Sequence, residues 1–491
     1  MSTRYETLFN LVRRTDAMNY ATDNMVRLQA VAAMSFFVNH FRIQLQESTG
    51  NYIYPSFLGV LEAPSGAGKN AGVSFALNVL GKSVVDRIES YWDGRVRELA
   101  SERKTALKLE AGAQFADDLK KMEKHVEKGM KTFWAGVRPI NVMQEVAGSF
   151  EGFAFDRAWL EKMGLGAPFM FVEEYGDKLV QMKQASYVKN LHSKVIQLVN
   201  NDKLMSKSIK SKDGETPGSK GMGITALFTL SSPDVRQKAD IRSGVVQAVG
   251  RRGHLVKETL LSLDYEKALG QRTCDEITDG EIFSHNESLA EWFDKMQDLV
   301  DSGYYTGADG FSTGRMVLPW GDGARQYYKK LKHENVKMYR EHALNSFVET
   351  KREQATLLKD LDRKSLKLAV TLAVFNHGDV NFELTVDDLK QGGKMAWEFY
   401  LSGKDFFRAE RTSSVERVIG FLVENGGKAS ARQMFEAKLF PGVNPRKVQG
   451  PILEMFEDYL FDEAEEKGFE ITQRKKGKQD LYFIRKLEKA V

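Results

Sequence analysis

The sequence predicts an α/β protein with a mainly parallel sheet at its core, helical regions before and after that core, and a separate C-terminal module. Residues 55–63, 168–172 and 223–230 are short, almost continuously apolar segments that alternate with stretches of helical spacing. Such segments are typical of parallel strands that helices cover on both faces. A glycine-rich turn joins the first segment to a helical run, an order that favours a phosphate-binding loop.

The composition is that of a globular chain and limits its partners. Of 491 residues, 42% are hydrophobic and 28% are charged, which is enough apolar material for a substantial core. The formal net charge is +4. The chain is therefore not a generally basic coat protein, and any nucleic-acid surface has to be local.

The sequence shows neither a cysteine pattern nor a targeting segment. Cys274 is the single cysteine, so an internal disulfide and a cysteine zinc cluster are excluded and a reducing compartment is indicated. Residues 1–14 lack the apolar core of a signal peptide. No run of about 18 apolar residues predicts a membrane span. We therefore expect a cytoplasmic protein without membrane contact.

Changes in residue pattern divide the chain into regions. Helical spacing of apolar residues predicts a helical N-terminal region at 1–48, followed by the α/β core at 49–260. A proline-free, charge-rich pair of helices interrupts this core at about 86–132, either as a plain hairpin or as a contact for a partner. Residues 261–404 are predicted to be mainly helical, and residues 405–491 form the C-terminal module.

The strongest motif lies at residues 63–70, between the first core strand and a helix. Glycines let backbone N–H groups turn toward phosphate oxygens, and Lys69 reaches the outer phosphates. Two positions depart from the usual pattern: Ala63 replaces a glycine, and Asn70 replaces the hydroxyl residue that normally holds Mg²⁺. We predict that ATP binds to Pro64, Ser65, Gly66, Ala67, Gly68, Lys69 and Asn70.

Two acidic residues directly follow the apolar segment 168–172. The end of a buried strand is where such ATPases hold Mg²⁺ and activate water. We predict that Glu173 binds Mg²⁺ together with Asn70, and that Glu174 is the base that polarises the attacking water. The alternative is a solvated pair of carboxylates that ends the strand.

Polar and basic residues follow the third apolar segment. Ser231 or Ser232 would position water near the γ-phosphate, unless these serines form an ordinary turn. In ring ATPases an arginine from a neighbouring subunit stabilises transition-state charge. Arg251 and Arg252 are the candidates for this role, with a pairing role at the surface as the alternative.

The order of phosphate loop, Glu-Glu strand, serine-ended strand and arginine resembles the replicative helicase-like P-loop ATPases of phages and mobile elements, which have AAA+ or RecA-like cores. The similarity spans roughly residues 50–400 and is most specific at Gly66, Gly68, Lys69 and Glu174. The resemblance implies ATP and Mg²⁺ as cofactors and DNA as the track. It also implies that the chain forms a homo-oligomeric ring, usually a hexamer, and that other replication proteins are its partners. The expected location is the cytoplasm of a host bacterium. A primase-type zinc or metal motif is not found in the sequence.

The C-terminal module has the element order of a winged helix-turn-helix. Three helices, at 413–425, 429–439 and 444–460, precede two extended segments that flank a Lys-Lys-Gly-Lys turn. In such a module the third helix enters the major groove and the wing contacts phosphates. The predicted DNA-binding residues are Arg446, Lys447, Gln449, Arg474, Lys475, Lys476 and Lys478. Winged helices also serve as protein-protein modules, and the acidic run 463–466 favours that alternative.

Two functions from different classes fit these patterns. The first is a phage-type replicative DNA helicase or helicase-like DNA translocase that hydrolyses ATP. The second is a replication initiator or helicase loader, in which ATP acts as a switch and the winged helix binds an origin. Asn70 and the C-terminal module favour the second. A packaging motor lacks support, because no nuclease-like acidic cluster follows the core.

Overall fold

The structure is a computed structural model. It describes residues 2–18, 21–48, 51–64, 67–137, 143–145, 150–163, 166–176, 198–199, 207–209, 214–216, 223–231, 251–258, 276–302, 316–344, 355, 357–377, 383–436, 464, 469–476 and 479–486. The chain divides into two compact units. The first comprises Met1–Lys332 and Leu361–Phe399, and the second comprises His333–Asp360 and Tyr400–Val491.

The first unit is built on a five-stranded sheet in the order β4-β5-β8-β3-β9, and every neighbouring pair is parallel. The predicted α/β class with a parallel sheet is therefore confirmed, as are strands in the three apolar segments. The strands are β3 (Phe57–Ala63), β4 (Met143–Glu145), β5 (Phe169–Val172), β8 (Thr225–Ser231) and β9 (His254–Lys257). All seven residues of both β3 and β8 are buried, which explains their almost continuous apolar character.

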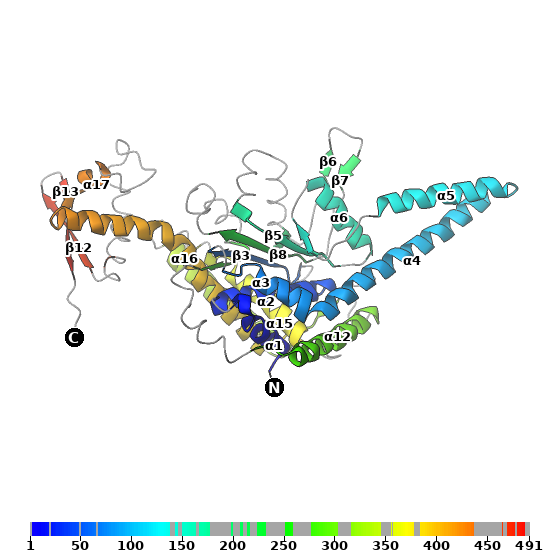
Figure 1. The fold of residues 1–491 in the computed structure, drawn as a ribbon, viewed down its shortest axis with the longest axis horizontal. Helices are drawn as coiled ribbons and strands as arrows, with labels where there is room; N and C mark the ends of the chain where they lie inside the picture. The colour runs from blue at the N-terminus through cyan, green and yellow to red at the C-terminus, as the bar shows by residue number, and fades with distance from the viewer. Residues whose placement is uncertain are drawn as a thin grey trace. The chain divides into compact units, whose positions relative to one another are not determined.

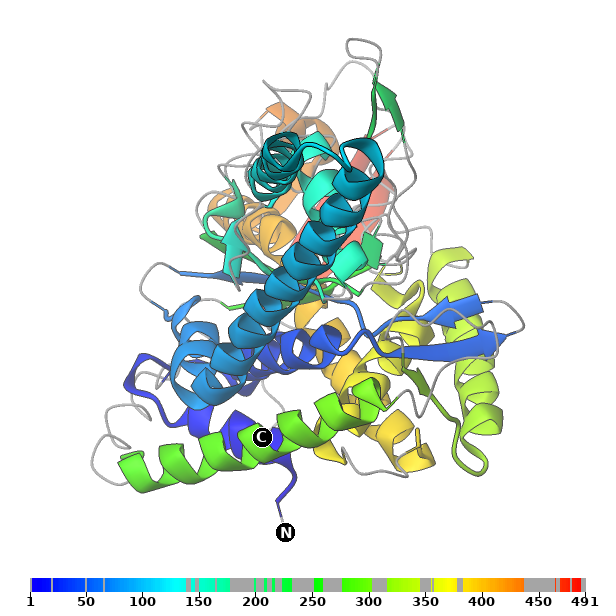
Figure 2. The same ribbon diagram turned by 90° about the vertical axis from the view of Figure 1, so that its right-hand side faces the viewer.

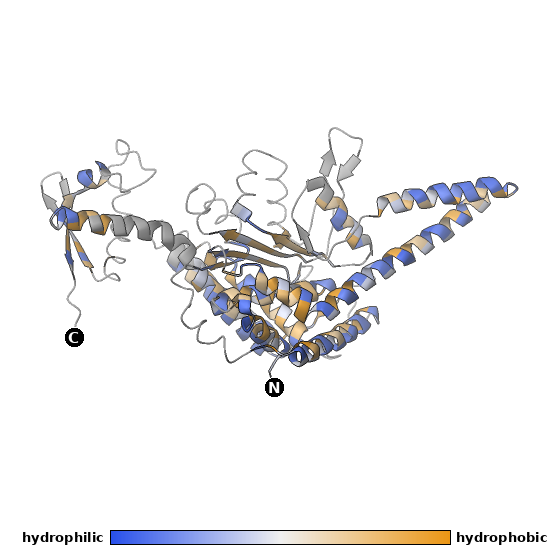
Figure 3. Cartoon of the chain, in the orientation of Figure 1, coloured by the Kyte–Doolittle hydropathy of each residue, from blue (hydrophilic) through white to orange (hydrophobic). Residues whose placement is uncertain are grey.

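Helix α2 (Asp23–His40) is the central helix of this unit. It contacts β3, β8 and β9 on one side and α15 (Leu361–Asn376) on another (Figures 1 and 2). Most residues of α2 are buried all round the helix, as expected for a helix enclosed in a core. Figure 3 shows the same pattern as apolar colour in the central strands and in the helices that pack on them.

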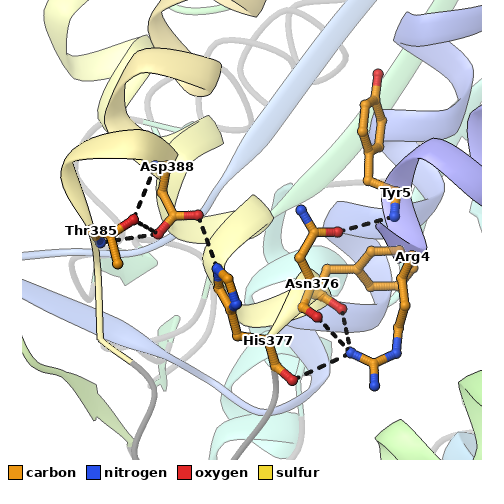
Figure 4. Close-up of polar contacts among 7 residues, drawn as sticks. Arg4, Tyr5, Asn376, His377, Thr385 and Asp388 are labelled. Carbon is orange, nitrogen blue, oxygen red and sulfur yellow. Dashed lines mark hydrogen bonds and ion pairs between the residues drawn. The ribbon is translucent and has the colours of Figure 1, made fainter. Parts of the chain in front are cut away.

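The N-terminal helix α1 (Arg4–Arg13) is tied to the carboxyl end of α15. Arg4 Nη1 donates to the backbone oxygens of Phe375, Asn376 and His377, at 2.7 Å for Asn376 (Figure 4). These carbonyls have no partner inside a helix, so a cation there satisfies them and complements the helix dipole. The contact joins residues more than 370 positions apart, so α15 packs in the same unit as the N-terminal helices.

The predicted charged insertion is a pair of long helices, α4 (Lys82–Gln114) and α5 (Leu119–Gly136). It lies in the chain between β3 and β4, two strands of the same sheet. The start of α4 is anchored on α12 (Asp279–Asp301), where Arg87 forms two bonds of 2.8 and 3.0 Å to Asp294. The rest of the pair is held together by contacts between α4 and α5, which run side by side in Figure 1.

The remaining elements of the first unit are shorter or peripheral. They are η1 (Asp16–Met18), β1 (Gln44–Ser48), β2 (Asn51–Ile53), α3 (Ala71–Phe75), the π-helical turn η2 (Ala76–Leu80), α6 (Phe150–Met163), β6 (Lys207–Ile209), β7 (Gly214–Thr216) and β10 (Val317–Leu318). Strands β10, β1 and β2 form a small second sheet. Helix α13 (Ala324–Leu344) continues from this unit into the second.

The second unit contains the predicted basic hairpin. Strands β12 (Phe469–Lys476) and β13 (Gln479–Lys486) pair antiparallel along their whole length, and β11 (Lys428–Ser430) pairs with β13. A small apolar core joins this sheet to α17 (Ala431–Glu436) and to the end of α16. Its buried residues are Val418, Ile419, Leu422, Ala429, Met434, Ala464, Ile471 and Tyr482.

Helix α16 differs from the prediction at the start of this module. The expected helix at 413–425 is the last part of α16 (Val386–Glu424), which runs without a break through residue 405. The helix ends as predicted at Gly426 and Gly427, whose φ angles are 71° and 81°. Gly427 N–H donates to Leu422 O at 2.8 Å, which is the closing bond of a glycine-ended helix. The expected helix at 429–439 begins as strand β11, and the one at 444–460 lies outside the described residues.

Within the part of the chain that the structure describes, no helix is both long and apolar enough to cross a membrane.

Candidate functional site

The predicted phosphate loop connects the carboxyl end of β3 to α3. Gly68 has a φ of +77°, and a Cβ atom placed there would lie 2.3 Å from the backbone oxygen of Ala17. A residue with a side chain would be strained at this φ and would also collide with backbone. The glycine that the motif requires is thus required by the local structure as well.

The other loop positions are partly described. Ala67 N–H donates to Pro64 O at 3.2 Å, and Ala71 N–H donates to Gly68 O at 3.1 Å where α3 begins. Ser65 and Gly66, which are also predicted to bind ATP, lie outside the described residues. The described part has the predicted order of strand, turn and helix.

Lys69 lies at the centre of a polar cluster formed by three separate segments. Its Nζ donates to Ser231 Oγ at 2.5 Å and lies 3.3 Å from Glu174 Oε1. Ser231 Oγ in turn lies 3.1 and 3.0 Å from the two carboxylate oxygens of Glu174. Lys69 and Ser231 are 8% and 7% exposed, so both polar groups are desolvated and depend on these partners.

Strand register explains why these residues meet. Ala63, the last residue of β3, is paired with Ser231, the last residue of β8, and β8 is also the neighbour of β5. Glu174 is the second residue after β5, so all three segments leave the sheet at its carboxyl edge. Ligands in open α/β sheets bind at this edge.

Glu174 has an unusual backbone conformation. Its φ of +46° lies in the left-handed region, which is uncommon for residues other than glycine and is found at functional sites. The next residue, Tyr175, is fully buried and stacks on Phe228 of β8 with ring centroids 4.5 Å apart. This stacking anchors the chain after β5 and holds Glu174 in reach of Lys69.

The predicted Mg²⁺ ligands are next to each other. Asn70 Nδ2 donates to Glu173 Oε1 at 2.7 Å. Asn70 Oδ1 is buried and accepts no hydrogen bond from a described residue. A hard oxygen donor of this kind, beside a carboxylate, fits a Mg²⁺ ion whose remaining ligands are waters and phosphate oxygens. The described residues contain no group of three or more His, Cys, Asp or Glu that would hold a metal without such ligands.

The site consists of two adjacent groups of residues, one suited to hold Mg²⁺ and the other to contact phosphate and water. A Mg²⁺ ion held by Asn70 and Glu173 would neutralise phosphate charge. Lys69 can exchange its carboxylate partner for a phosphate oxygen, because Glu174 is 49% exposed and its carboxylate can be solvated when released. Glu174 would then be available to accept a proton from water, and Ser231 keeps its carboxylate oriented.

Two contributors to the site were not predicted. Gln29 Oε1 accepts from Val73 N–H at 2.9 Å, and Gln29 Nε2 lies 3.5 Å from Gly68 O, so this α2 residue braces both ends of the loop-to-helix turn. Its sequence signal is a polar residue inside the apolar run of a buried helix. Glu62 and Lys257 form a buried ion pair at 3.6 Å across β3 and β9, directly behind the loop. Nothing local marks that pair, because its members are far apart in sequence.

Arg251 and Arg252 lie at a different edge of the sheet. They lie before β9, separated from it by Gly253, and the first residue of β9, His254, is paired with Gly59 near the start of β3. Four strand residues separate Gly59 from the carboxyl end of β3, a distance of about 13 Å. The structure therefore does not bring these arginines to the Lys69 cluster of their own chain.

The predicted DNA-binding residues are only partly described. Arg474 is exposed in β12, and its guanidinium lies over the ring of Phe483 at 5.4 Å. Lys475 and Lys476 belong to the same strand, and Lys478 falls outside the described residues. Arg446, Lys447 and Gln449, the predicted start of the third helix, also fall outside them.

Comparisons with known proteins do not assign the chain to a family. No protein-family model matches it. A search of curated proteins also finds no match.

Proposed function

We propose that the chain is an ATP hydrolase that acts on DNA, as a replicative helicase or helicase-like translocase of phage type. The observation that supports this most directly is the cluster of Lys69, Ser231 and Glu174 at the carboxyl edge of three adjacent parallel strands. A loop lysine, a polar strand-end residue and a carboxylate are the groups that phosphoryl transfer to water requires. Asn70 and Glu173 supply oxygen ligands for Mg²⁺ beside them.

The proposal is tested by the rate of ATP hydrolysis of the full chain, alone and with single-stranded or duplex DNA. We expect Mg²⁺-dependent hydrolysis that DNA stimulates severalfold, because a translocase couples its cycle to its track. Strand displacement from a forked duplex should then require ATP. Absence of ATP binding, measured by calorimetry with Mg²⁺ present, would contradict the assignment of the site.

An initiator or helicase loader is the second candidate. Asn70 stands where a hydroxyl residue usually holds Mg²⁺, which suits a slow hydrolase that uses ATP as a switch. Such a protein would protect one specific DNA sequence in a footprint and would not separate strands. ATP-driven strand separation without sequence preference favours the helicase.

Arg251 and Arg252 are proposed to act on the active site of a neighbouring subunit in a ring. Their position at the amino edge of the sheet excludes direct contact with the Lys69 cluster in the same chain. We expect Arg251→Ala or Arg252→Ala to lower hydrolysis strongly. Mixing either variant with Lys69→Ala should partly restore it, because some interfaces then pair an intact lysine with an intact arginine. Inactive mixtures that demonstrably co-assemble would count against a shared site.

The C-terminal module is proposed to bind DNA as a winged helix with the β12–β13 hairpin as its wing. Replacing Lys475, Lys476 and Lys478 with Gln in the full chain should weaken duplex binding and make it less dependent on salt. Each lost phosphate contact reduces the slope of log affinity against log salt by about 0.9. Fluorescence anisotropy at low and moderate salt measures both effects. Unchanged binding would instead favour a protein-docking role for the module.

A further inference from the structure

Helix α5 carries an unusual share of the charge of the chain. Its 18 residues include five lysines and two glutamates, a net charge of +3, whereas the formal net charge of all 491 residues is +4. A local positive surface of this kind is what a chain of low overall charge would need in order to attract a polyanion.

Four of these lysines form one face of the helix. Lys120, Lys124, Lys128 and Lys131, called here the lysine face, are separated by four, four and three residues. They fall within roughly 80° of the helix circumference at steps of about 4.5–6 Å along its axis. All four are exposed, and none forms an ion pair with another described residue. Glu127 lies at the border of this face.

Several basic residues of the neighbouring helix α4 form ion pairs within that helix. In α4, Lys82 pairs with Asp86, Arg95 with Glu98, and Arg103 with Glu110. Local pairing of this kind is what a solvated helix surface commonly shows. The lysine face of α5 lacks it, which leaves its ammonium groups available to an external anion.

The opposite side of α5 contacts α4, although no residue of α5 is buried. A Cβ atom placed on Gly129 would lie 2.5 Å from Leu107 Cδ2, so α5 approaches α4 as closely as a glycine allows. Phe115 and His125 add a ring contact at 5.8 Å between the centroids. An amphipathic helix binds a bilayer through its apolar side, and here Met122, Val126 and Met130 on that side are half-buried. Near the end of the helix, Trp134 is 49% exposed and provides a ring on which a base can stack.

We propose that the lysine face of α5 binds the phosphate backbone of nucleic acid, as a second contact separate from the C-terminal module. The inference rests on the proposed function to the extent that nucleic acid is the track. It adds that the α4–α5 hairpin is an arm that holds this track near the ATPase core. Lysines spaced along a helix contact phosphates as point charges, so the binding is independent of sequence.

The test measures binding of the full chain to labelled single-stranded and duplex oligonucleotides over a range of salt concentrations. One variant carries Lys→Gln at positions 120, 124, 128 and 131, and a matched control carries Lys→Arg at the same positions. Glutamine and arginine both have helix propensities close to that of lysine, so circular dichroism should show an unchanged fold. Hydrolysis of ATP without DNA should also be unchanged in both variants.

We expect the glutamine variant to bind at least tenfold more weakly at low salt, while the arginine variant binds like the unmodified protein. Loss of four phosphate contacts should reduce the salt slope by up to about 3.6 on duplex and about 2.8 on a single strand. A larger effect on the single strand would identify that form as the ligand. Parent-like affinity and slope in the glutamine variant would overturn the inference while leaving the proposed function intact. The inference would also be overturned if the glutamine variant lost binding to anionic phospholipid vesicles but retained binding to nucleic acid. A parent that hydrolyses no ATP contradicts the proposed function instead.

Discussion

Replacing Lys69 with Ala should abolish hydrolysis of ATP, with a loss of at least a hundredfold to a thousandfold. The ammonium group is expected to contact the β- and γ-phosphates and to stabilise the charge that develops on them, and removal of one such donor has effects of this size. Steady-state phosphate release, measured with saturating ATP and Mg²⁺, gives the rate.

The fold should survive this substitution. The partner Glu174 is half-exposed, so water can solvate its carboxylate after the change, and Ser231 keeps its contacts with that carboxylate. We expect a shift in melting temperature of a few degrees at most, since a partly exposed ion pair contributes about 1 kcal/mol or less. Lys82→Ala is the matched control, because Lys82 is an exposed lysine paired with Asp86 on α4. Equal hydrolysis in the parent and the Lys69 variant would remove the phosphate-loop assignment.

Replacing Glu174 with Gln should separate binding of ATP from its hydrolysis. Glutamine has the same shape and can still interact with Ser231 and Lys69, but it cannot accept a proton from water. We expect hydrolysis to fall by about a hundredfold to ten-thousandfold, the usual contribution of a general base. ATP affinity should be equal or higher, because the carboxylate that competes with phosphate for Lys69 has lost its charge.

Glu173→Gln provides the comparison. Its side chain contacts Asn70 rather than Ser231, so we expect Mg²⁺ to bind more weakly and hydrolysis to require a higher concentration of the metal. Calorimetry of ATP binding, together with single-turnover hydrolysis, distinguishes the two effects. If Glu173→Gln alone stopped hydrolysis with ATP binding intact, the two carboxylates would have exchanged the roles proposed here.

The sequence predicted those parts of the fold that depend on local pattern. Apolar runs located β3, β5 and β8, and a charge-rich stretch without proline located α4 and α5. The structure added that Gly68 of the predicted loop has a positive φ. Helix ends were less predictable. Helix α16 continues through residue 405 because no proline interrupts it before the positive-φ glycines Gly426 and Gly427; its internal pair Gly392 and Gly393 stays helical.

The sequence by itself determined where the proposed phosphate loop, its lysine and the acidic pair lie in the chain, because each is recognised by neighbouring residues. Only the tertiary structure decided which of them meet. It placed Ser231 and Glu174 on Lys69, put Gln29 behind the loop, and assigned Arg251 and Arg252 to the opposite edge of the sheet. These outcomes follow from strand order and register and, for Gln29, from the packing of α2 on the sheet, and they join residues that are 44 to 162 positions apart. Local propensity carries no information about such pairing, because its free energy comes from contacts that exist only after the sheet has formed.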